Sequence, residues 1–202
     1  MVNNFAQIRT LLKFDNGDAF YSIDVMKRRK DNPGLFTDSV LIGSFEIRSI
    51  QQFDHLMPIF IEVCNGTNAR AYIRLNRRTN AKVSKETLRR ISGHNADCCY
   101  SSVRSVIDSI IGKHHSEKDR TWVVDLDYDK CPAETDINDW LNELISFVQA
   151  LIFEGKRDDT VHIVNTVNGV HLVCRPFNRK KFKDKYANID VHDDNLTLLY
   201  AK

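Results

Sequence analysis

Several signatures of familiar protein classes are missing from the sequence. None of the motifs GxxxxGKS/T, GxGxxG and GxSxG occurs. The sequence therefore lacks the motifs that define a P-loop ATPase, a dinucleotide-binding enzyme and a serine hydrolase. The five cysteines are odd in number and form no CxxC pair, which argues against a disulfide framework and against a zinc ribbon. No apolar run reaches about 18 residues, and the first residues have no long apolar core. We therefore expect a cytoplasmic protein without a signal peptide or a membrane span.

Charge is nearly balanced over the whole chain but is segregated along it. The 202 residues include 29 Lys and Arg against 27 Asp and Glu, and hydrophobic residues make up 42%, as in a globular protein that can bury a core without disulfides. Residues 125–159 contain ten acids and three bases, whereas residues 175–185 contain six bases and one acid. We expect the first region to hold cations and the second to hold anions.

The first half of the chain shows short segments of alternating type. A basic turn at 27–34 joins two expected strands, and its four bases must be solvated or bound to a partner, with a solvated loop as the default expectation. The polar segment 113–120 is the most linker-like part of the chain, so a subdomain boundary is predicted there. The expected elements of this half are a helix at 5–14, strands at 19–26, 39–47, 57–64 and 71–76, and helices at 85–93 and 103–111.

The second half gives a clearer order of elements. A strand is expected at 122–126, and apolar residues at i, i+3, i+4 and i+7 predict a helix from 137 to 152. Two further strands, 161–166 and 170–177, flank an Asn-Gly pair that favours a tight hairpin turn. The order is β-α-β-β, with a last strand at 197–200.

Strand geometry places ionisable residues of this half on one face. Side chains two positions apart on a strand share a face, so Asp125 and Asp127 point the same way. With Asn-Gly as the two turn residues, Thr166 sits opposite His171, and the face that carries His171 also carries Arg175. We expect function on this polar face.

The paired carboxylates allow more than one interpretation. Two oxygen donors at this spacing suit hard divalent cations such as Mg²⁺ or Mn²⁺. The alternative is that Asp125 and Asp127 end a strand, accept bonds from the backbone or from arginine, and bind nothing. A calcium loop fits poorly, because Lys130 stands where that loop needs glycine. For His171, a structural hydrogen bond to a neighbouring carbonyl is the alternative to contact with a ligand.

The order of these motifs resembles the catalytic core of the archaeo-eukaryotic primase superfamily, the primase-polymerases. That core has a strand ending in hydrophobic-Asp-x-Asp, a helix, a strand with a small residue two positions before a histidine, and a strand with hydrophobic-Asp. In this sequence VVDLD supplies Asp125 and Asp127, GVH supplies His171, and NID supplies Asp190. The resemblance covers residues 120–200 by motif, while residues 1–112 fit only loosely.

The resemblance implies an α+β fold with a mixed or antiparallel sheet. It implies an RRM-like β-α-β-β catalytic half at 121–202 and an N-terminal α/β half at 1–112, together forming one compact unit. It also implies that the three aspartates bind Mg²⁺ or Mn²⁺ and that the histidine contacts the phosphates of the incoming nucleotide.

The sequence departs from the family's pattern in two places. The serine that is often found two residues before the histidine is Gly169 here. The third carboxylate motif is short and could use Asp193 or Asp194 in place of Asp190. These departures leave a non-catalytic module as an alternative.

Basic residues that could bind a triphosphate or a nucleic-acid backbone form two groups, for which a solvated surface is the alternative. The first group follows the histidine strand and the second lies near the end of an expected strand. The candidates are Arg175, Arg179 and Lys180, and Arg74, Arg77 and Arg78.

Together these features predict a metal-dependent nucleotidyltransferase of the primase-polymerase type. Its partners would be nucleoside triphosphates and a single-stranded or template nucleic acid, with no membrane, and a phage or mobile-element origin is expected from the resemblance. One alternative is a phosphodiesterase or nuclease that uses the same carboxylates with water. Another is a nucleic-acid-binding module without activity.

Overall fold

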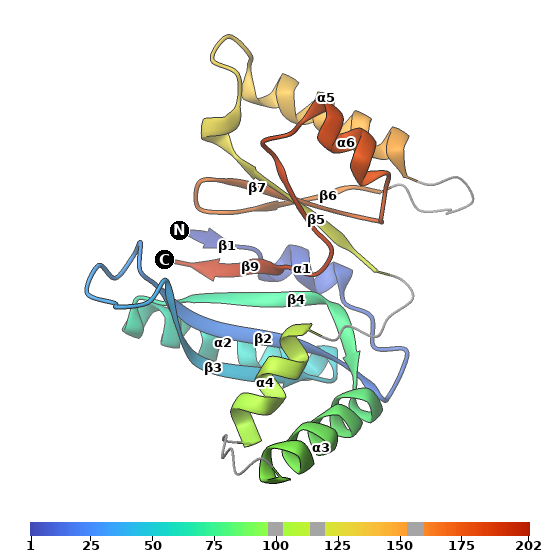
Figure 1. Cartoon of the computed structure of the whole chain (residues 1–202). Coiled ribbons are helices and arrows are strands. Elements are labelled where there is room, and N and C mark those ends of the chain that lie inside the picture. Colours follow the sequence, from blue (N-terminus) through green and yellow to red (C-terminus); the bar gives the residue numbers. More distant parts are fainter. Residues whose placement is uncertain (97–102, 114–119, 153–159) are drawn as a thin grey trace.

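The computed structural model describes residues 1–96, 103–113, 120–152 and 160–202, which form six α-helices and nine strands (Figure 1). The strands form two antiparallel sheets, named here sheet A and sheet B. The predicted α+β class is confirmed. Most of the predicted linker, residues 114–119, lies outside the described residues.

Sheet A has five strands and is covered on one face by α2 (Ile50–Thr67), which buries Phe53, Phe60 and Cys64 against it. α1 (Phe5–Leu11) adds Phe5 and Ile8 to the same core. α3 (Asn80–Ala96) and α4 (Val103–Lys113) pack together around a smaller apolar cluster at one end of the sheet. The strands, in spatial order, are β1 (Val2–Asn3), β9 (Leu196–Ala201), β4 (Arg70–Thr79), β2 (Ala19–Arg28) and β3 (Ser39–Ile47).

The helix α2 replaces one of the predicted strands, 57–64. That prediction rested on β-branched and aromatic content, but the residues that α2 buries are spaced by seven and four positions, which is helical spacing. Ser49 caps the helix by accepting a hydrogen bond from the Gln52 amide, and Asn68 ends it in the left-handed conformation. These two caps set the ends of the helix, whereas residue composition alone had predicted a strand within it.

Sheet B has four strands and is covered on one face by α5 (Ile137–Leu151) and α6 (Arg179–Lys185) (Figure 1). Val124 and Leu126 are alternate residues of one inner strand, β5 (Trp122–Asp127), and both are buried between the sheet and these helices. A single 3₁₀ turn, η1 (Tyr128–Lys130), directly follows β5. The strands, in spatial order, are β6 (His162–Asn165), β7 (Gly169–Cys174), β5 (Trp122–Asp127) and β8 (Asp190–His192).

The hairpin between β6 and β7 differs in register from the prediction. His171 pairs with Val164 and not with Thr166, because the Thr166 amide bonds the Gly169 carbonyl and the two turn residues are 167 and 168. The shift is two positions, so it preserves which residues share a face. The predicted polar face of β7 therefore remains a polar face.

The two sheets are joined by the strand β9. After β8 closes one edge of sheet B, β9 runs into sheet A between β1 and β4, although its residues belong to the half predicted at 121–202. The core of sheet A also includes Val123, Val164 and Val173 from sheet B. Among the described residues, no helix has the length and apolar character needed to cross a membrane.

Candidate functional site

The predicted site residues of sheet B lie along a single row across three strands. Asp125 on β5 pairs with His171 on β7 and, on its other side, with Asp190 on β8. Residues directly opposite one another in antiparallel strands point to the same face. Asp127 is two positions farther along β5, opposite Gly169, and shares that face. This face is turned toward sheet A, away from α5 and α6.

Asp125 and His171 form a close pair within this row. The Nε2 atom of His171 lies 3.3 Å from Oδ1 of Asp125, and the histidine side chain is only 8% exposed. The hydrogen bond from His171, opposed by burial, lowers the pKa of Asp125 below its usual value. The other ring nitrogen of His171, Nδ1, is buried and has no hydrogen-bond partner among the described residues. That nitrogen is therefore a buried polar atom whose hydrogen-bonding capacity is not met by the described residues.

The carboxylates and the histidine line a pocket of about 190 Å³, here called the carboxylate pocket. Asp125, Asp127 and His171 contribute from sheet B, together with the hairpin turn of β6 and β7. The facing wall comes from β2, the turn after it, β4 and β9 of sheet A. The residues that line this second wall are Arg28, Lys30, Arg70, Tyr72, Asn195, Leu196 and Leu198.

The bases of the second wall are held in different ways. Arg70 is buried and forms two hydrogen bonds with Asp31, of 2.6 and 2.7 Å, which fix its position. Partial burial and the positive charges of Arg70 and Arg28 lower the pKa of Lys30. The Nε atom of Arg28 is buried without a hydrogen-bond partner in the described part of the chain. Three positively charged side chains therefore lie opposite the carboxylates, and the Nε–H group of Arg28 donates no hydrogen bond to the described residues.

Asp190 takes a different environment from its neighbours in the row. Its side chain is 64% exposed and lies between two lysines, 4.0 Å from Nζ of Lys130 and 3.7 Å from Nζ of Lys183. It is not among the residues that line the carboxylate pocket. The alternative third carboxylate, Asp194, is paired with Arg78, and the exposed Asp193 contributes its backbone carbonyl to Asn76. Asp190 therefore remains the carboxylate nearest to Asp125 along the row.

The donor set fits a divalent cation only in part. Across the described ranges, no three His, Cys, Asp or Glu side chains are placed so that they could hold a metal ion together. Asp125 and Asp127 nevertheless direct hard oxygen donors to one side of the pocket. Mg²⁺ is commonly held by one or two carboxylates, with substrate phosphates and water completing its shell. The pair therefore suits an ion that binds together with a phosphorylated substrate.

The basic residues predicted after the histidine strand do not reach this pocket. Arg175 lies four positions beyond His171 on the same face and lines a separate cavity at the other end of the sheet. Arg179 donates a hydrogen bond to the Val191 carbonyl, and Lys180 is exposed on α6. The structure therefore separates Arg175 from the phosphate-binding position predicted for it.

The basic residues predicted on β4 are mostly engaged within the protein. Arg74 lies 3.8 Å from a carboxylate oxygen of Asp24, and Arg77 contacts Asp15. Arg78 is fully buried, and its guanidinium bonds Asp194 and two backbone carbonyls. Arg78 thus has no surface to offer a nucleic acid and holds elements of the fold together instead.

The bases that face the carboxylates were not identified from the sequence. Arg28 and Lys30 belong to the basic turn for which solvation was the default expectation, and Arg70 is the first residue of β4, one position before the predicted strand at 71–76. The run of four bases at 27–30 was the available signal. Its partner could not be found, because the facing aspartates are about a hundred residues away in the chain.

We compared the chain with protein-family models, with curated proteins and with solved structures, and none of the three comparisons gave a match. The geometry of the carboxylate pocket is therefore the basis for assigning a function. A pair of carboxylates, a histidine with an unpartnered ring nitrogen among the described residues and a wall of bases are the features on which such a function would rest.

Proposed function

We propose that this protein is a metal-dependent nucleotidyltransferase of the primase-polymerase type, which joins nucleoside triphosphates on a nucleic-acid template. The observation that carries the proposal is the carboxylate pocket, where two aspartates and a histidine of sheet B face two arginines and a lysine. A nucleoside triphosphate with its divalent cation presents both charges that such walls would bind.

The topology of sheet B supports the same assignment. Its elements follow the order β5-α5-β6-β7-α6-β8, and the strands lie in the order β6-β7-β5-β8. This order agrees with the split β-α-β motif, and the RRM-like arrangement of this half is part of the proposal. The fold alone does not determine function, so the proposal depends on the residues placed on its polar face.

Asp125 and Asp127 are the residues that would hold Mg²⁺ or Mn²⁺. Bound there, the ion supplies charge stabilisation to the attacking and leaving oxygens of a displacement at phosphorus. The lowered pKa of Asp125 keeps this carboxylate ionised at neutral pH, which is the form that binds a cation. Asp190 would support the site from the neighbouring strand, once its carboxylate turns from the two lysines.

The remaining residues of the pocket would position the triphosphate. The unpartnered Nδ1 of His171 and the unpartnered Nε of Arg28 both offer a hydrogen bond to a phosphate oxygen, if the histidine is protonated there. Arg70 is anchored by Asp31 and presents a fixed positive charge. Fixed donors lower the barrier by holding the reacting groups in line.

The decisive experiment measures nucleotide incorporation with purified full-length protein. Labelled single-stranded and primed templates are incubated with Mn²⁺ and nucleoside triphosphates. We expect strand growth, and we expect Asp125→Asn or Asp127→Asn to reduce it by more than about 100-fold, because the metal ligands are lost. Circular dichroism of each variant verifies that it is folded.

Asp129 provides a matched control, because it follows the same run of aspartates but is exposed in η1 outside the pocket. Asp129→Asn should keep wild-type activity. Shortening of the labelled strand without growth would assign a phosphodiesterase instead. Salt-sensitive binding with neither growth nor shortening would indicate a non-catalytic module.

A further inference from the structure

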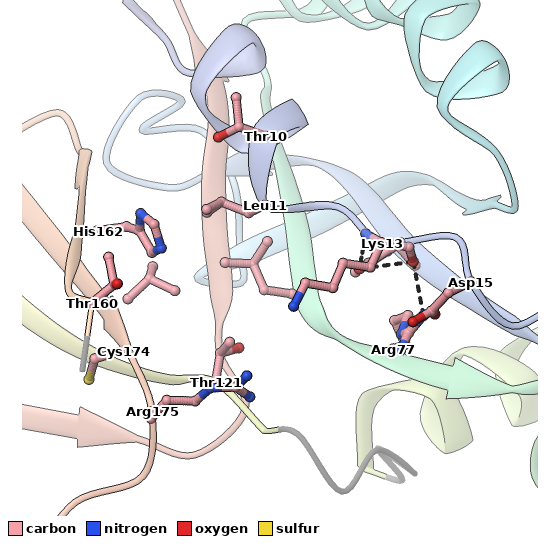
Figure 2. Close-up of a pocket in the computed structure, with 13 residues that line it drawn as sticks. Thr10, Leu11, Lys13, Asp15, Arg77, Thr121, Thr160, His162, Cys174 and Arg175 are labelled. Carbon is pink, nitrogen blue, oxygen red and sulfur yellow. Dashed lines mark hydrogen bonds and ion pairs between the residues drawn. The ribbon is translucent and has the colours of Figure 1, made fainter. Parts of the chain in front are cut away.

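A second and larger cavity, drawn in close-up in Figure 2, is lined by residues nearer the other ends of β4 and β7 than those of the carboxylate pocket. Its volume is about 400 Å³, within the range of roughly 300–1,000 Å³ that is usual for small-molecule sites. It is lined by the end of α1 and the loop after it, by β2 and β4, by Thr121 just before β5, and by β6 and β7 with the residues next to them. We call it the Lys13 pocket.

Positive charge dominates the described lining of the Lys13 pocket. Lys13, Arg77 and Arg175 come from three separate elements, and His162 adds an imidazole. The one acidic residue among the described lining residues is Asp15, whose carboxylate contacts the Arg77 guanidinium. That contact lowers the pKa of Asp15, so it remains ionised. The formal charge of the described lining therefore favours an anion.

Lys13 is held in place by its backbone while its side chain remains at the surface. Its amide donates a 2.8 Å hydrogen bond to the hydroxyl of Tyr21, and its carbonyl accepts one of 3.0 Å from Arg77. The side chain extends from this loop into the pocket (Figure 2). An ammonium group on an anchored backbone is preorganised for a ligand, which reduces the entropy cost of binding.

The remaining wall of the Lys13 pocket is apolar. Leu11, Leu75 and Val173 line it beside the charged groups. Cys174 also lines it, but burial raises the pKa of this thiol to about 12, so it is not a nucleophile at neutral pH. A pocket with cationic groups on one side and apolar side chains on another suits a ligand that has an anionic group and an apolar group. Because the Cys174 thiol is not ionised, we expect this ligand to bind without forming a covalent bond.

We propose that the Lys13 pocket is a second ligand site, which binds a small organic phosphate of about the size of a nucleoside monophosphate. The phosphate contacts Lys13 and the neighbouring guanidinium groups, and the organic part packs on Leu11, Leu75 and Val173. This site is separate from the carboxylate pocket: Arg175 directly follows β7 and lies four positions beyond His171, about 13 Å along an extended chain. Val173 lies between them and is buried. The inference does not depend on the proposed function.

The test measures binding of AMP, ADP, adenosine and inorganic phosphate by calorimetry, with EDTA present so that no divalent ion bridges a nucleotide to the aspartates. We expect saturable binding of AMP that Lys13→Glu weakens by about tenfold or more. We expect Asp15→Asn to strengthen it, because the lining loses its carboxylate. Inorganic phosphate and adenosine should each bind more weakly than AMP, since each lacks one of the two parts.

Controls separate this site from the carboxylate pocket. Lys85→Glu changes an exposed lysine on α3 and should leave AMP binding unchanged. Asp125→Asn should keep AMP binding while it loses nucleotide incorporation, so the two proposals can fail independently. Lys13→Gln serves as a milder variant if the charge reversal perturbs folding. Absence of saturable binding of AMP and ADP, equal affinity in Lys13→Glu and wild type, or equal affinity for AMP and inorganic phosphate would each overturn the assignment.

Discussion

At the scale of single residues, the pairing of Asp125 with His171 sets the charge of the candidate site. The carboxylate is partly buried, which disfavours its ionised form, but the hydrogen bond from His171 outweighs this effect and lowers its pKa. A carboxylate whose pKa is lower in the folded state than in the unfolded chain stabilises the fold above its unfolded pKa, near 3.9. That contribution is lost as the pH falls through the folded pKa.

Replacing His171 by phenylalanine should therefore raise the pKa of Asp125 and destabilise the protein most at neutral pH. The carboxyl titration followed by NMR measures the first effect, and urea denaturation at pH 7 and pH 3 measures the second. We expect the stability difference between variant and wild type to shrink as the pH falls through the folded-state pKa of Asp125. His55→Phe, at an exposed position on α2, is the control. An unchanged Asp125 titration would contradict the pairing.

Arg28 tests the triphosphate-binding role, which rests on the proposed function. Arg28→Ala removes the buried, unpartnered donor from the pocket, so we expect the KM for nucleoside triphosphates to rise by about tenfold with a smaller change in kcat. Arg29→Ala is the matched control, because Arg29 is exposed and paired with Asp38. Steady-state kinetics of incorporation give both parameters. Equal KM values for the two variants would remove Arg28 from the site.

Gly169 departs from the serine of the family that the sequence resembles, and the structure gives a physical reason. A Cβ atom at this position would lie 1.9 Å from the Leu126 carbonyl oxygen and 2.9 Å from Cα of Asp127. Both atoms belong to backbone, which cannot move aside without disturbing the β5–β7 pairing that places Asp127. The backbone of β7 here approaches β5 too closely for any side chain at 169.

Gly169→Ala should therefore destabilise the protein by about 1–3 kcal/mol or more, the usual range for overpacking. It should also lower activity more than the stability loss explains, because Asp127 is displaced. Gly17→Ala, where an added Cβ meets nothing within 4 Å, should change stability by less than about 0.5 kcal/mol. Urea denaturation measures both variants. If Gly169→Ala unfolds at the same urea concentration as the wild type, β5 and β7 can move apart with little loss of stability.

At the scale of elements, capping residues determine where the helices begin. Asp136 precedes α5 and accepts hydrogen bonds from the amides of Asn138 and Asp139, at 2.8 and 3.3 Å. It occupies the helix end where a negative charge is favourable. The helix itself buries Trp140 and Leu144 against sheet B, so its position affects the layer behind the candidate site.

Asp136→Ala should lower the free energy of unfolding by about 1 kcal/mol, because two amides lose their acceptor. Asp136→Ser should recover most of this loss, since serine also caps helices. Glu134→Ala, an exposed neighbour in the preceding loop, should have no effect. Urea denaturation compares the three variants. If Ala and Ser destabilise equally, the cap is not the cause.

At the scale of the whole molecule, a buried network links the two sheets. Arg78 on β4 is fully buried, and it bonds Asp194 at 2.5 Å and the Ile111 carbonyl at 2.7 Å. Asn76, also on β4, bonds the carbonyls of Thr121 and Asp193. The start of β5 and the connection between β8 and β9 are thereby fixed to sheet A.

Asp194→Ala should destabilise the protein by about 3–5 kcal/mol, because it leaves the buried charge of Arg78 without a partner. Replacing both residues, as in Arg78→Met with Asp194→Leu, should recover part of this loss. Asp193→Ala is the control, because the contact of Asp193 in this network is through its backbone. Urea denaturation gives the free energies. A small effect of Asp194→Ala would mean that water reaches the arginine.

The sequence predicted sheet B better than sheet A. Strand β5, helix α5 and the β6–β7 hairpin are adjacent in sequence and follow local periodicity, so the shared face of Asp125, Asp127 and His171 could be deduced. The wall of bases opposite them depends on how sheet A packs on sheet B, which no local pattern encodes. The same reason explains why the sequence did not indicate that Arg175, just after β7, lines a different cavity from His171.

The position of β9 has a consequence for how the protein is made. Strand β9 pairs with both β1 and β4, and the marked ends of the chain lie side by side (Figure 1). During synthesis, the edge of β4 that pairs with β9 stays unpaired until residues 196–201 have left the ribosome. Leu196 and Leu198 of that strand also line the carboxylate pocket. A nascent chain that ends before residue 196 therefore lacks the strand between β1 and β4 and two residues of the pocket lining.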